Sequence, residues 1–498
     1  MGGWGRLIGA LWRLARNDAL LPRELEALYP PGVAAAAGFV HLFAGPEART
    51  GRPGQRLAHA FEGLGPVAIK LGQLLSTRAD IFGIEFAEDL SRLKDRLAPF
   101  PTEVARREIE ASLGKPVDAL YARFGEPVGA ASLAQAHDAA LPDGRRVAVK
   151  VLRPGVGRRV AEDSQAMRLA GRLLERWFPA TRRLEPSALA ETVIRATELE
   201  LDLRLEAAGA DELREVMARD GYMTAPKVVW PGVGKSVLTM EWAQGLPLSD
   251  PAALDQPGLD RQTMADNLIR AFLAQALDHG VFHADLNEGN LFVAAPARIE
   301  AVDFGIIGRL GPAERRYLAE ILLGFLERDY DRVARVHFEA GYVPRRHSVA
   351  AFAQALRAVG EQVFGRPASE VPMSRVLVQL FEITALFEMR LRPELVLLQK
   401  TMMTVEGVAR RIRPDHDMWQ AADPVVRRWI LRELAPPARI RRFADDAQEA
   451  LRNIARMLEA PAAPPVTIVE ERTQGAPLWF ALGAATAGAA FLIAALVR

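Results

Sequence analysis

The chain has 498 residues, half of them hydrophobic, so it can bury a large core, and its length allows about three domains. Its 63 Lys and Arg nearly balance its 62 Asp and Glu, which excludes an overall basic field for nucleic-acid binding, and we expect no nucleic-acid partner. Cysteine is absent, which excludes disulfides, thiolate catalysis and cysteine-ligated metal sites and fits a reducing compartment.

The N-terminus predicts a basic amphipathic helix and not a signal peptide. The apolar residues from Trp4 to Leu14 are interrupted by Arg6 and Arg13, so no continuous apolar segment forms. Such a helix docks on its own protein, which is the simpler interpretation, or lies on an anionic membrane. The helical pattern continues, and we assign residues 1–115 to a helical N-terminal extension.

The pattern changes to short β-runs near Pro127. A run at 129–141, the turn Pro142-Asp143-Gly144 and a β-branched run at 146–152 predict a hairpin. Residues 160–218 have the pattern of a long, charged helical stretch. We therefore predict an α+β, bilobal arrangement, with a mostly β lobe at 116–245 and a helical lobe at 246–440.

The C-terminal segment predicts a single transmembrane helix. The 20 residues from Leu478 to Val497 carry no charge, and at a rise of ~1.5 Å per residue they span ~30 Å, the hydrocarbon thickness of a bilayer. A proline-rich linker at 441–475 precedes the helix, which we place at 476–498. Arginine is concentrated before this span, so the positive-inside rule places the body of the protein in the cytoplasm.

The stretch from His283 to Gly305 predicts phosphoryl transfer from Mg-ATP. It reads His283-x-Asp285, then Asn290, then Asp303-Phe304-Gly305. In such a set the first Asp orients or deprotonates the acceptor, while the Asn and the second Asp bind Mg²⁺. Each piece is weak evidence alone, but together and in this order they are strong. We therefore predict Asp285 as the base and Asn290 and Asp303 as metal ligands.

Lys150 is the predicted phosphate-binding lysine. It follows Val147-Ala148-Val149 at the end of the second hairpin strand, where a solvated strand-end charge is the alternative. Its partner should be an acid on the next long helix. Helical spacing places Glu198, Asp202 and Glu206 on one face of such a helix, which would usually be a solvated stripe.

The loop above the phosphates is rich in alanine instead of glycine. Gly129 is followed by Ala130, Ala131 and Ser132, and the methyl groups make this loop stiffer than a Gly-x-Gly loop. The sequence at 231–236 ends in Gly-Lys-Ser but lacks the first glycine of a Walker A loop, so we interpret it as a turn between strands. No Ala-Pro-Glu triplet follows Gly305, which argues against peptide recognition by the usual protein-kinase route.

A further motif, Lys70-Leu71-Gly72-Gln73, completes a resemblance to one family. By periodicity alone Lys70 and Gln73 form a polar face of an amphipathic helix. Together with the motifs above, roughly residues 55–330 resemble the UbiB/ADCK atypical kinases, which are associated with ubiquinone (coenzyme Q) biosynthesis. The resemblance implies a protein-kinase-like fold in which Lys70 and Gln73 cross the active-site cleft and restrict it.

The resemblance also implies roles for individual residues. The alanine-rich loop of the family corresponds to Ala130, Ala131, Ser132 and Gln135, which would contact nucleotide. The family's Glu-x-Asp motif falls on Glu200 and Asp202, and the acid that pairs with Lys150 falls on Glu206. The nucleotide hinge lies near Glu241 and Ala243.

Two residues of the catalytic loop depart from the family pattern His-x-Asp-x-His-Pro-Gly-Asn. Asn287 stands where the family has a second His, and Glu288 stands where it has Pro. The family also often has two C-terminal spans where this chain has room for one. Asp285 and Asn290 remain, so metal and nucleotide chemistry stay plausible.

From these residues and this resemblance we predict an ATPase or phosphotransferase that supports ubiquinone biosynthesis at the inner membrane. Its expected partners are membrane lipids, prenylated quinone precursors and other quinone-biosynthesis proteins. One alternative is a catalytically weak pseudokinase that binds lipid and scaffolds biosynthetic enzymes. A second is an aminoglycoside-phosphotransferase-like enzyme, against which the Lys70–Gln73 motif and the predicted span argue.

Overall fold

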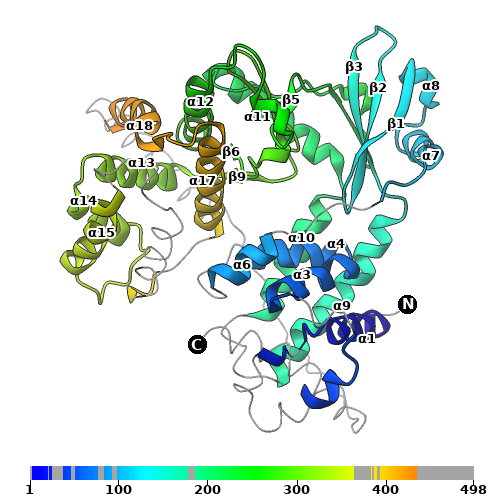
Figure 1. Ribbon diagram of the computed structural model, residues 1–498, viewed down its shortest axis with the longest axis horizontal. Coiled ribbons are helices and arrows are strands. Elements are labelled where there is room, and N and C mark those ends of the chain that lie inside the picture. Colours follow the sequence, from blue (N-terminus) through cyan, green and yellow to red (C-terminus); the bar gives the residue numbers. More distant parts are fainter. Residues whose placement is uncertain are drawn as a thin grey trace, which may run out of the picture.

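The computed structural model of the chain describes residues 3–20, 22–24, 37–45, 51–76, 83–91, 93, 98–177, 185–363, 383, 386–389 and 393–434. Three parts can be followed in Figure 1: a group of helices from the N-terminal region, a lobe built on a four-stranded sheet, and a mostly helical lobe. The predicted bilobal, protein-kinase-like arrangement with a helical N-terminal extension has this architecture.

The sheet lobe is an antiparallel sheet in the order β1-β2-β3-β4. The predicted hairpin is present as β2 and β3, paired so that Ala136 lies opposite Lys150, and Gly144 takes up a positive φ of 86° in the turn. Two helices, α7 and α8, cover one face of the sheet and bury Val147, Val149 and Val151 against Ile109. The elements are β1 (Arg123–Ala130), β2 (Ala134–Ala140), β3 (Arg146–Leu152), β4 (Val237–Glu241), α7 (Thr102–Leu113) and α8 (Val117–Leu120).

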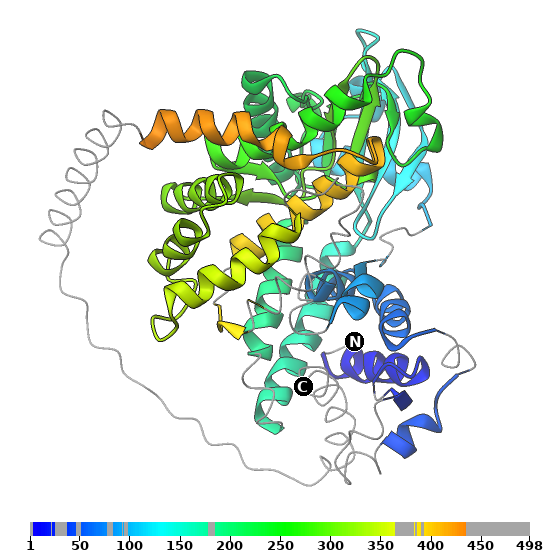
Figure 2. The same ribbon diagram turned by 60° about the vertical axis from the view of Figure 1, so that its left-hand side comes forward.

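The N-terminal helices pack on a long helical hairpin, which is formed by α9 and α10 and follows β3 in the chain. Leu57, Phe61 and Leu90 form part of their shared core, and Arg6 pairs with Glu162 at 2.6 Å, which ties α1 to α9. Figure 2 shows these helices gathered beside α9 and α10. The elements are α1 (Gly3–Arg16), α3 (Pro53–Leu64), α4 (Pro66–Ser76), α6 (Ile84–Ser91), α9 (Val156–Trp177) and α10 (Pro186–Leu199).

The helical stretch predicted at 160–218 is divided among α9, α10 and a third helix, α11. Helix α10 ends at Leu199, and α11 (Leu203–Asp220) begins after Asp202, whose side chain caps it by accepting a hydrogen bond from the Arg204 N–H at 3.1 Å. The expectation that Glu198, Asp202 and Glu206 share one helical face is therefore wrong. The cap turns the chain, and Glu206 lies on a separate helix.

The helical lobe carries the loops with the predicted catalytic residues. A π-helical turn, η6 (Gln275–His279), leads from α12 into β6 (Val281–His283), and a 3-10 turn, η7 (Glu288–Asn290), leads into β7. Two small antiparallel sheets, β5-β7-β8 and β6-β9, support these loops. The remaining elements are β5 (Leu246–Pro247), α12 (Arg261–Ala274), β7 (Leu291–Ala294), β8 (Arg298–Ala301), β9 (Ile307–Arg309), α13 (Pro312–Leu326), α14 (Tyr330–Glu339), α15 (Val349–Val363), α17 (Pro393–Ile412) and α18 (Met418–Leu434).

The predicted transmembrane helix is not part of the fold that the structure supports. Residues 441–475 and 476–498 lie outside the described residues, and among the described helices none is both long and apolar enough to cross a bilayer. Helices α9 and α17 have 22 and 20 residues, but charged residues interrupt both. The fold prediction is therefore corrected to the kinase-like part that the structure describes, which supports neither the transmembrane helix nor the single-pass inner-membrane location.

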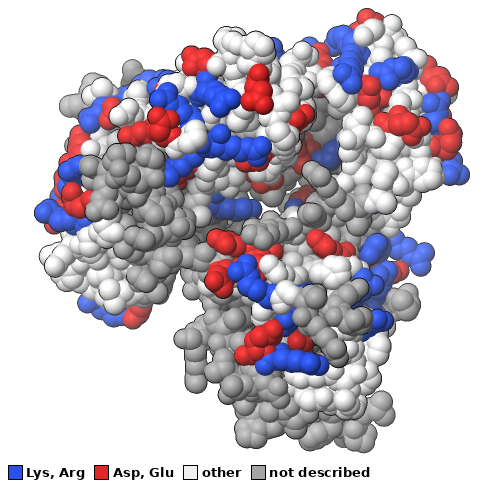
Figure 3. Space-filling view, in the orientation of Figure 1, with Lys and Arg blue, Asp and Glu red and all other residues white. Residues whose placement is uncertain are grey.

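The Gly-Lys-Ser sequence lies in a turn region, as predicted. A short 3-10 helix, η4 (Trp230–Gly232), lies between an isolated bridge from Val228 to Met240 and strand β4. Lys235 is exposed there. Figure 3 shows acidic and basic side chains interspersed over one face of the molecule, as the near-zero net charge predicts.

Candidate active site

One cluster of charges joins three segments that are distant in sequence. Lys150 Nζ lies 2.6 Å from Glu206 Oε1 on α11 and 3.2 Å from Asp303 Oδ1. Successive residues of a strand point to opposite faces, so Lys150 leaves β3 on the side away from buried Val149 and Val151. The Glu206 side chain is only 9% exposed. Three of the predicted site residues therefore meet at the junction of the two lobes.

The members of this cluster control one another's ionisation. The Lys150 ammonium lowers the pKa of the Asp303 carboxyl to about 2. Burial raises the pKa of Glu206, although Lys150 opposes the effect. Burial on its own lowers the pKa of Lys150, but the two carboxylates outweigh it and raise that pKa above its ordinary value. Lys150 and Asp303 are thus both charged at neutral pH, and the ammonium is available to an anionic phosphate.

Helix α11 is held against the segment that follows Asp303. Arg309 of β9 pairs with Glu212 at 2.5 Å, and a Cβ added at Gly209 would come within 2.2 Å of Ile307 Cδ1. The absence of a side chain at 209 permits this close approach. Asp303 has a φ of 62°, in the left-handed region that a non-glycine residue rarely adopts, and such strain gathers at functional sites.

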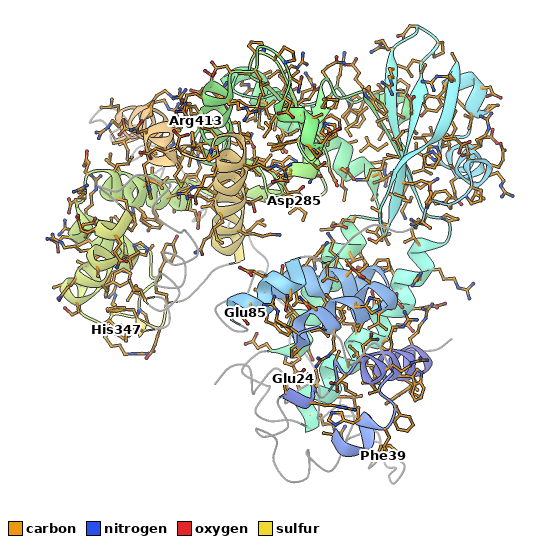
Figure 4. The ribbon with its side chains drawn as sticks, in the orientation of Figure 1. Glu24, Phe39, Glu85, Asp285, His347 and Arg413 are labelled. Carbon is orange, nitrogen blue, oxygen red and sulfur yellow. The ribbon has the colours of Figure 1, made fainter. Side chains whose placement is uncertain are left out.

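His283 braces the catalytic loop. The ring is buried; its Nδ1 accepts a hydrogen bond from the Asp285 N–H at 3.1 Å, and its Nε2 donates to the Val302 carbonyl at 3.1 Å. A ring with one accepting and one donating nitrogen is neutral. Burial lowers the pKa of His283, which preserves that state. His283 therefore fixes Asp285 relative to the residue before Asp303. Figure 4 places Asp285 where the three parts of the molecule converge.

Asn290 lies beside Asp285 and is linked to the Asp303 segment. Its Nδ2 donates to the Asp285 carbonyl at 3.0 Å and to Asp285 Oδ2 at 3.1 Å, and its own carbonyl accepts from the Val302 N–H at 2.9 Å. These bonds leave Asn290 Oδ1 for another ligand. One amide oxygen and one carboxylate suit Mg²⁺, which takes few protein ligands and keeps water and phosphate oxygens.

The described residues contain no group of three or more His, Asp or Glu side chains arranged to hold a metal. Asn290 and Asp303 supply two oxygen donors, which suits an ion that also takes phosphate oxygens as ligands.

The two departures from the family loop have defined places. Asn287 caps η7, since its side-chain oxygen accepts a hydrogen bond from the Gly289 N–H at 2.8 Å. Glu288 forms an ion pair with Arg411 of α17. Neither residue contacts Asp303, so the departures change how the loop is held and not which groups it presents.

The alanine-rich loop closes tightly on itself. The Ala131 N–H donates to the Ala134 carbonyl at 2.8 Å, and Arg153 Nε donates to the Ala131 carbonyl at 2.9 Å. Ala130 ends β1, and Ser132 is buried. The loop at the edge of the sheet is therefore anchored by side chain and backbone alike, as expected for a stiff loop.

Gln135 is used to hold the chain that enters the sheet lobe. Its Oε1 accepts from the Phe100 N–H at 2.8 Å, and its Nε2 donates to the Phe100 carbonyl at 3.0 Å. The buried His137 lies 2.8 Å from the same amide. The structure thus places Gln135 in a buried backbone contact, whereas the resemblance implied that it contacts nucleotide.

The predicted hinge follows β4. Glu241 pairs with Arg145 at 2.9 Å, and Ala243 is buried. A cavity of about 870 Å³ lies against the hinge, but none of Lys150, Asp285 or Asp303 lines it. Its lining residues are Arg145, Arg146, Arg214, Ala218, Thr224, Ala225, Pro226, Lys227, Glu241, Trp242, Gln244, Arg298 and Glu300.

Helix α4 carries the Lys70–Gln73 motif to the edge of the site. Lys70 forms an ion pair with Glu200, and its charge contributes to the lowered pKa of Asp303. Burial raises the pKa of Glu200, which Lys70 opposes. Gln73 is half-buried on the same helix. The Glu-x-Asp motif therefore anchors α4 through Glu200. The sequence did not predict that Lys70 pairs with Glu200.

Gly72 explains why this helix needs a glycine, and it supports a stability prediction. A Cβ at this position would lie 2.2 Å from Leu93 Cδ1 and 2.8 Å from the Phe61 ring. Gly72→Ala is therefore expected to lower the free energy of unfolding by about 2 kcal/mol through overpacking. Thermal and urea unfolding would measure it. Gly83→Ala is a poor control because Gly83 has a positive φ, so Gly129→Ala, which meets nothing within 4 Å, is the matched one.

The buried His283 predicts a pH dependence of stability. Its pKa is lowered in the folded protein, so below about pH 6.5 the unfolded chain binds a proton that the native ring does not. Stability from this group is present above that pH and is lost as the pH falls, by up to ~1.4 kcal/mol per pH unit. In His283→Gln, the free energy of unfolding should depend less steeply on pH between pH 7.5 and 5.5, by the contribution of one bound proton. An unchanged slope in this variant would contradict the prediction.

Some residues that hold the site were missed by sequence reasoning. The Gln275 side chain accepts from the His283 N–H at 3.0 Å, and the Thr401 hydroxyl lies 3.1 Å from the Ala284 carbonyl. Arg411 reaches Glu288 from the same helix as Thr401. These residues belong to helices with ordinary apolar patterns, and no local signal marks them.

Comparisons with known proteins match the chain in two stretches. Residues 92–337 match the family described as ABC1 atypical kinase-like domain, and residues 356–417 match the UbiB helical domain. A protein of Marinobacter nauticus named "Probable protein kinase UbiB" is 41% identical over 406 residues, which cover 80% of this chain and 74% of that protein. Its namesake in Cellvibrio japonicus is 38% identical over 443 residues, which cover 87% and 79%.

A solved structure also shares the fold. The complex of Rv3197 with erythromycin, from Mycobacterium tuberculosis, aligns with a TM-score of 0.52 at 22% identity and covers 73% of this chain and 92% of that one. This likeness supports the kinase-like architecture.

Proposed function

Because the chain belongs to the UbiB family of atypical kinases, we propose that it binds Mg-ATP and transfers the terminal phosphoryl group to water or to a small lipid-like acceptor in support of ubiquinone biosynthesis. The observation that carries the proposal is the Lys150 ammonium, 2.6 Å from Glu206 and 3.2 Å from Asp303. This is the arrangement of lysine, helix acid and metal-binding acid that nucleotide phosphates require.

Each residue has a distinct task in the proposed reaction. Lys150 neutralises phosphate charge, and Glu206 keeps its ammonium in place. Asp285 accepts the proton of the attacking hydroxyl as the bond from phosphorus to the acceptor oxygen forms and the bond to the leaving oxygen breaks. Asn290 and Asp303 would hold Mg²⁺, which supplies positive charge to the phosphate oxygens.

The acceptor is proposed to be small because of α4. The Lys70–Glu200 ion pair holds this helix near Asp303, and the resemblance implies that a protein substrate would otherwise dock there. A prenylated phenol, as a quinone precursor, is the acceptor class that we favour. Other quinone-biosynthesis proteins are the proposed partners.

The second candidate is a catalytically weak member that binds lipid and scaffolds biosynthetic enzymes. The observation that favours it is the same Lys70 charge, since a fixed cation near Asp303 competes with the metal there. The two candidates differ in turnover and not in nucleotide binding.

Asp285→Asn is expected to separate them. The amide cannot accept the hydroxyl proton, so phosphate release should fall by about 10²- to 10³-fold, while Mg-ATP binding changes little because Asn290 and Asp303 remain. Turnover would be measured with and without a prenyl-phenol and anionic lipid vesicles. If the unmodified protein binds Mg-ATP but shows no turnover under any of these conditions, the scaffold function is favoured. Profiling quinone intermediates in a deletion strain would test the pathway assignment.

A further inference from the structure

Helix α17 follows the catalytic loop and contacts it on both sides of Asp285. Before Asp285, the Thr401 hydroxyl lies 3.1 Å from the Ala284 carbonyl and is itself buried. After Asp285, Glu288 forms its ion pair with Arg411. Thr401 and Arg411 are ten positions apart, about 15 Å along the helix axis, and the four positions from Ala284 to Glu288 reach at most about 14 Å when extended. Figure 1 shows α17 beside β6, which leads into this loop, and beside β9, the strand paired with β6.

Glu288 occupies a backbone position at which a conformationally rigid residue is normally favoured. It is the first residue of η7, directly after the capping Asn287, where proline is often found because its fixed φ suits the start of a helical turn. Asn287 has φ −82° and ψ 168°, the extended conformation that a residue before proline adopts. Among the described residues, no hydrogen bond from the Glu288 N–H is present, so the backbone does not restrain it by that route. The Glu288 carbonyl does accept a bond from the Ser249 N–H at 3.2 Å.

We propose that Arg411 is a positioning residue for the catalytic loop. Its guanidinium, through the Glu288 carboxylate, supplies the restraint that a proline at 288 would supply covalently. Arg411 does not contact Asp285 or Asn290, but it holds the turn between them. Through Arg411 and Thr401, helix α17 determines the position of Asp285. The proposal rests on the proposed phosphoryl transfer for its effect on rate, although its effect on the loop is independent of turnover.

A mutant cycle tests the proposal. Arg411→Ala is expected to lower kcat for ATP turnover by ~10-fold with KM for ATP changed less than about 2-fold, because misplacing a base costs rate more than binding. Arg411→Lys keeps the charge and should recover part of the loss. Glu288→Pro should leave kcat near that of the unmodified protein, and in that background Arg411→Ala should change kcat by less than about 2-fold. An equal loss in both backgrounds would overturn the proposal.

Arg413 provides the matched control. It is an exposed arginine at the end of the same helical region and pairs with Asp415 at 2.8 Å, away from the loop; Figure 4 shows it far from Asp285 along the α17 side of the lobe. Arg413→Ala should leave kcat unchanged. If Glu288→Pro does not fold, the exchange of charges in Glu288→Arg/Arg411→Glu takes its place, and it should restore activity that Arg411→Glu alone loses.

Hydrogen exchange separates this proposal from the proposed function. The Gly289 and Asn290 N–H groups both bond to Asn287, at 2.8 and 3.0 Å. Their exchange should become faster in Arg411→Ala and return to the original rate in Glu288→Pro/Arg411→Ala. Unchanged exchange in Arg411→Ala would refute the positioning role even if the protein turns over ATP. Faster exchange in a protein without turnover would uphold it and reject only the catalytic proposal.

Discussion

Asp303→Asn is expected to abolish the Mg²⁺-dependent part of the stabilisation that ATP gives. The carboxylate is ionised at neutral pH because Lys150 lowers its pKa to about 2, and an uncharged amide at this position would lack the negative charge that holds Mg²⁺. At ATP concentrations ~100 times the dissociation constant, ligand binding adds about 2.7 kcal/mol. The loss should appear as equal thermal shifts with Mg²⁺ and with EDTA.

Lys235→Ala is the control for this result. Lys235 is exposed in the turn before β4, and its Gly-Lys-Ser context is the other place where a phosphate site could be suspected. The substitution should leave the Mg²⁺-dependent shift intact. An equal loss in both variants would mean that the phosphate site has been placed wrongly.

The acid stability of the Asp303 interaction follows from the same pKa. Because the folded-state pKa lies below the ordinary value, the attraction to Lys150 contributes fully above about pH 4 and is lost as the pH falls toward 2. The comparison of Asp303→Asn with the unmodified protein therefore belongs near pH 7.5, where this contribution is complete.

Lys150→Ala is expected to remove both activity and stability. Without the ammonium, Glu206 remains buried with no cation from β3, and breaking such a pair from one side costs about 3 kcal/mol. Loss of the phosphate contact should lower turnover by at least ~10²-fold. Urea unfolding and phosphate release measure the two effects separately.

Glu206→Gln in the Lys150→Ala background distinguishes the causes. A neutral amide does not need the missing cation, so the double variant should regain most of the lost stability while turnover stays low. If the single variant is as stable as the unmodified protein, Glu206 is not held by Lys150 in solution, and the cluster is not the core of the site.

Local sequence was sufficient where the interacting groups lie close together in the chain. The turn at 142–144 predicted the hairpin. Because successive side chains of a strand point to opposite faces, Lys150 then lies on the face of β3 opposite the buried valines. The spacing of His283, Asp285 and Asn290 likewise predicted one loop, since His283 bonds the Asp285 N–H and Asn290 bonds the Asp285 side chain. These contacts span five residues or fewer, so pattern and geometry decide them together.

Local periodicity failed where a helix cap interrupts it. The face proposed for Glu198, Asp202 and Glu206 does not exist, because Asp202 ends one helix and begins another. The apolar run at 476–498 suggested a membrane span from composition alone, and the part of the chain that the structure describes contains no helix able to span a bilayer. The run itself lies outside the described residues.

The sequence by itself determined which chemical groups the protein has: one lysine on a strand, two acids and an amide on neighbouring loops, and a glycine-containing motif near the N-terminus. The tertiary structure alone decided their partners, since it pairs Lys70 with Glu200, Gln135 with the Phe100 backbone and Arg411 with Glu288. The sequence contains many other charged residues with which Lys70 and Arg411 could have paired. The packing of helices from distant parts of the chain selects among them, because burial makes one pairing favourable and leaves the others in water.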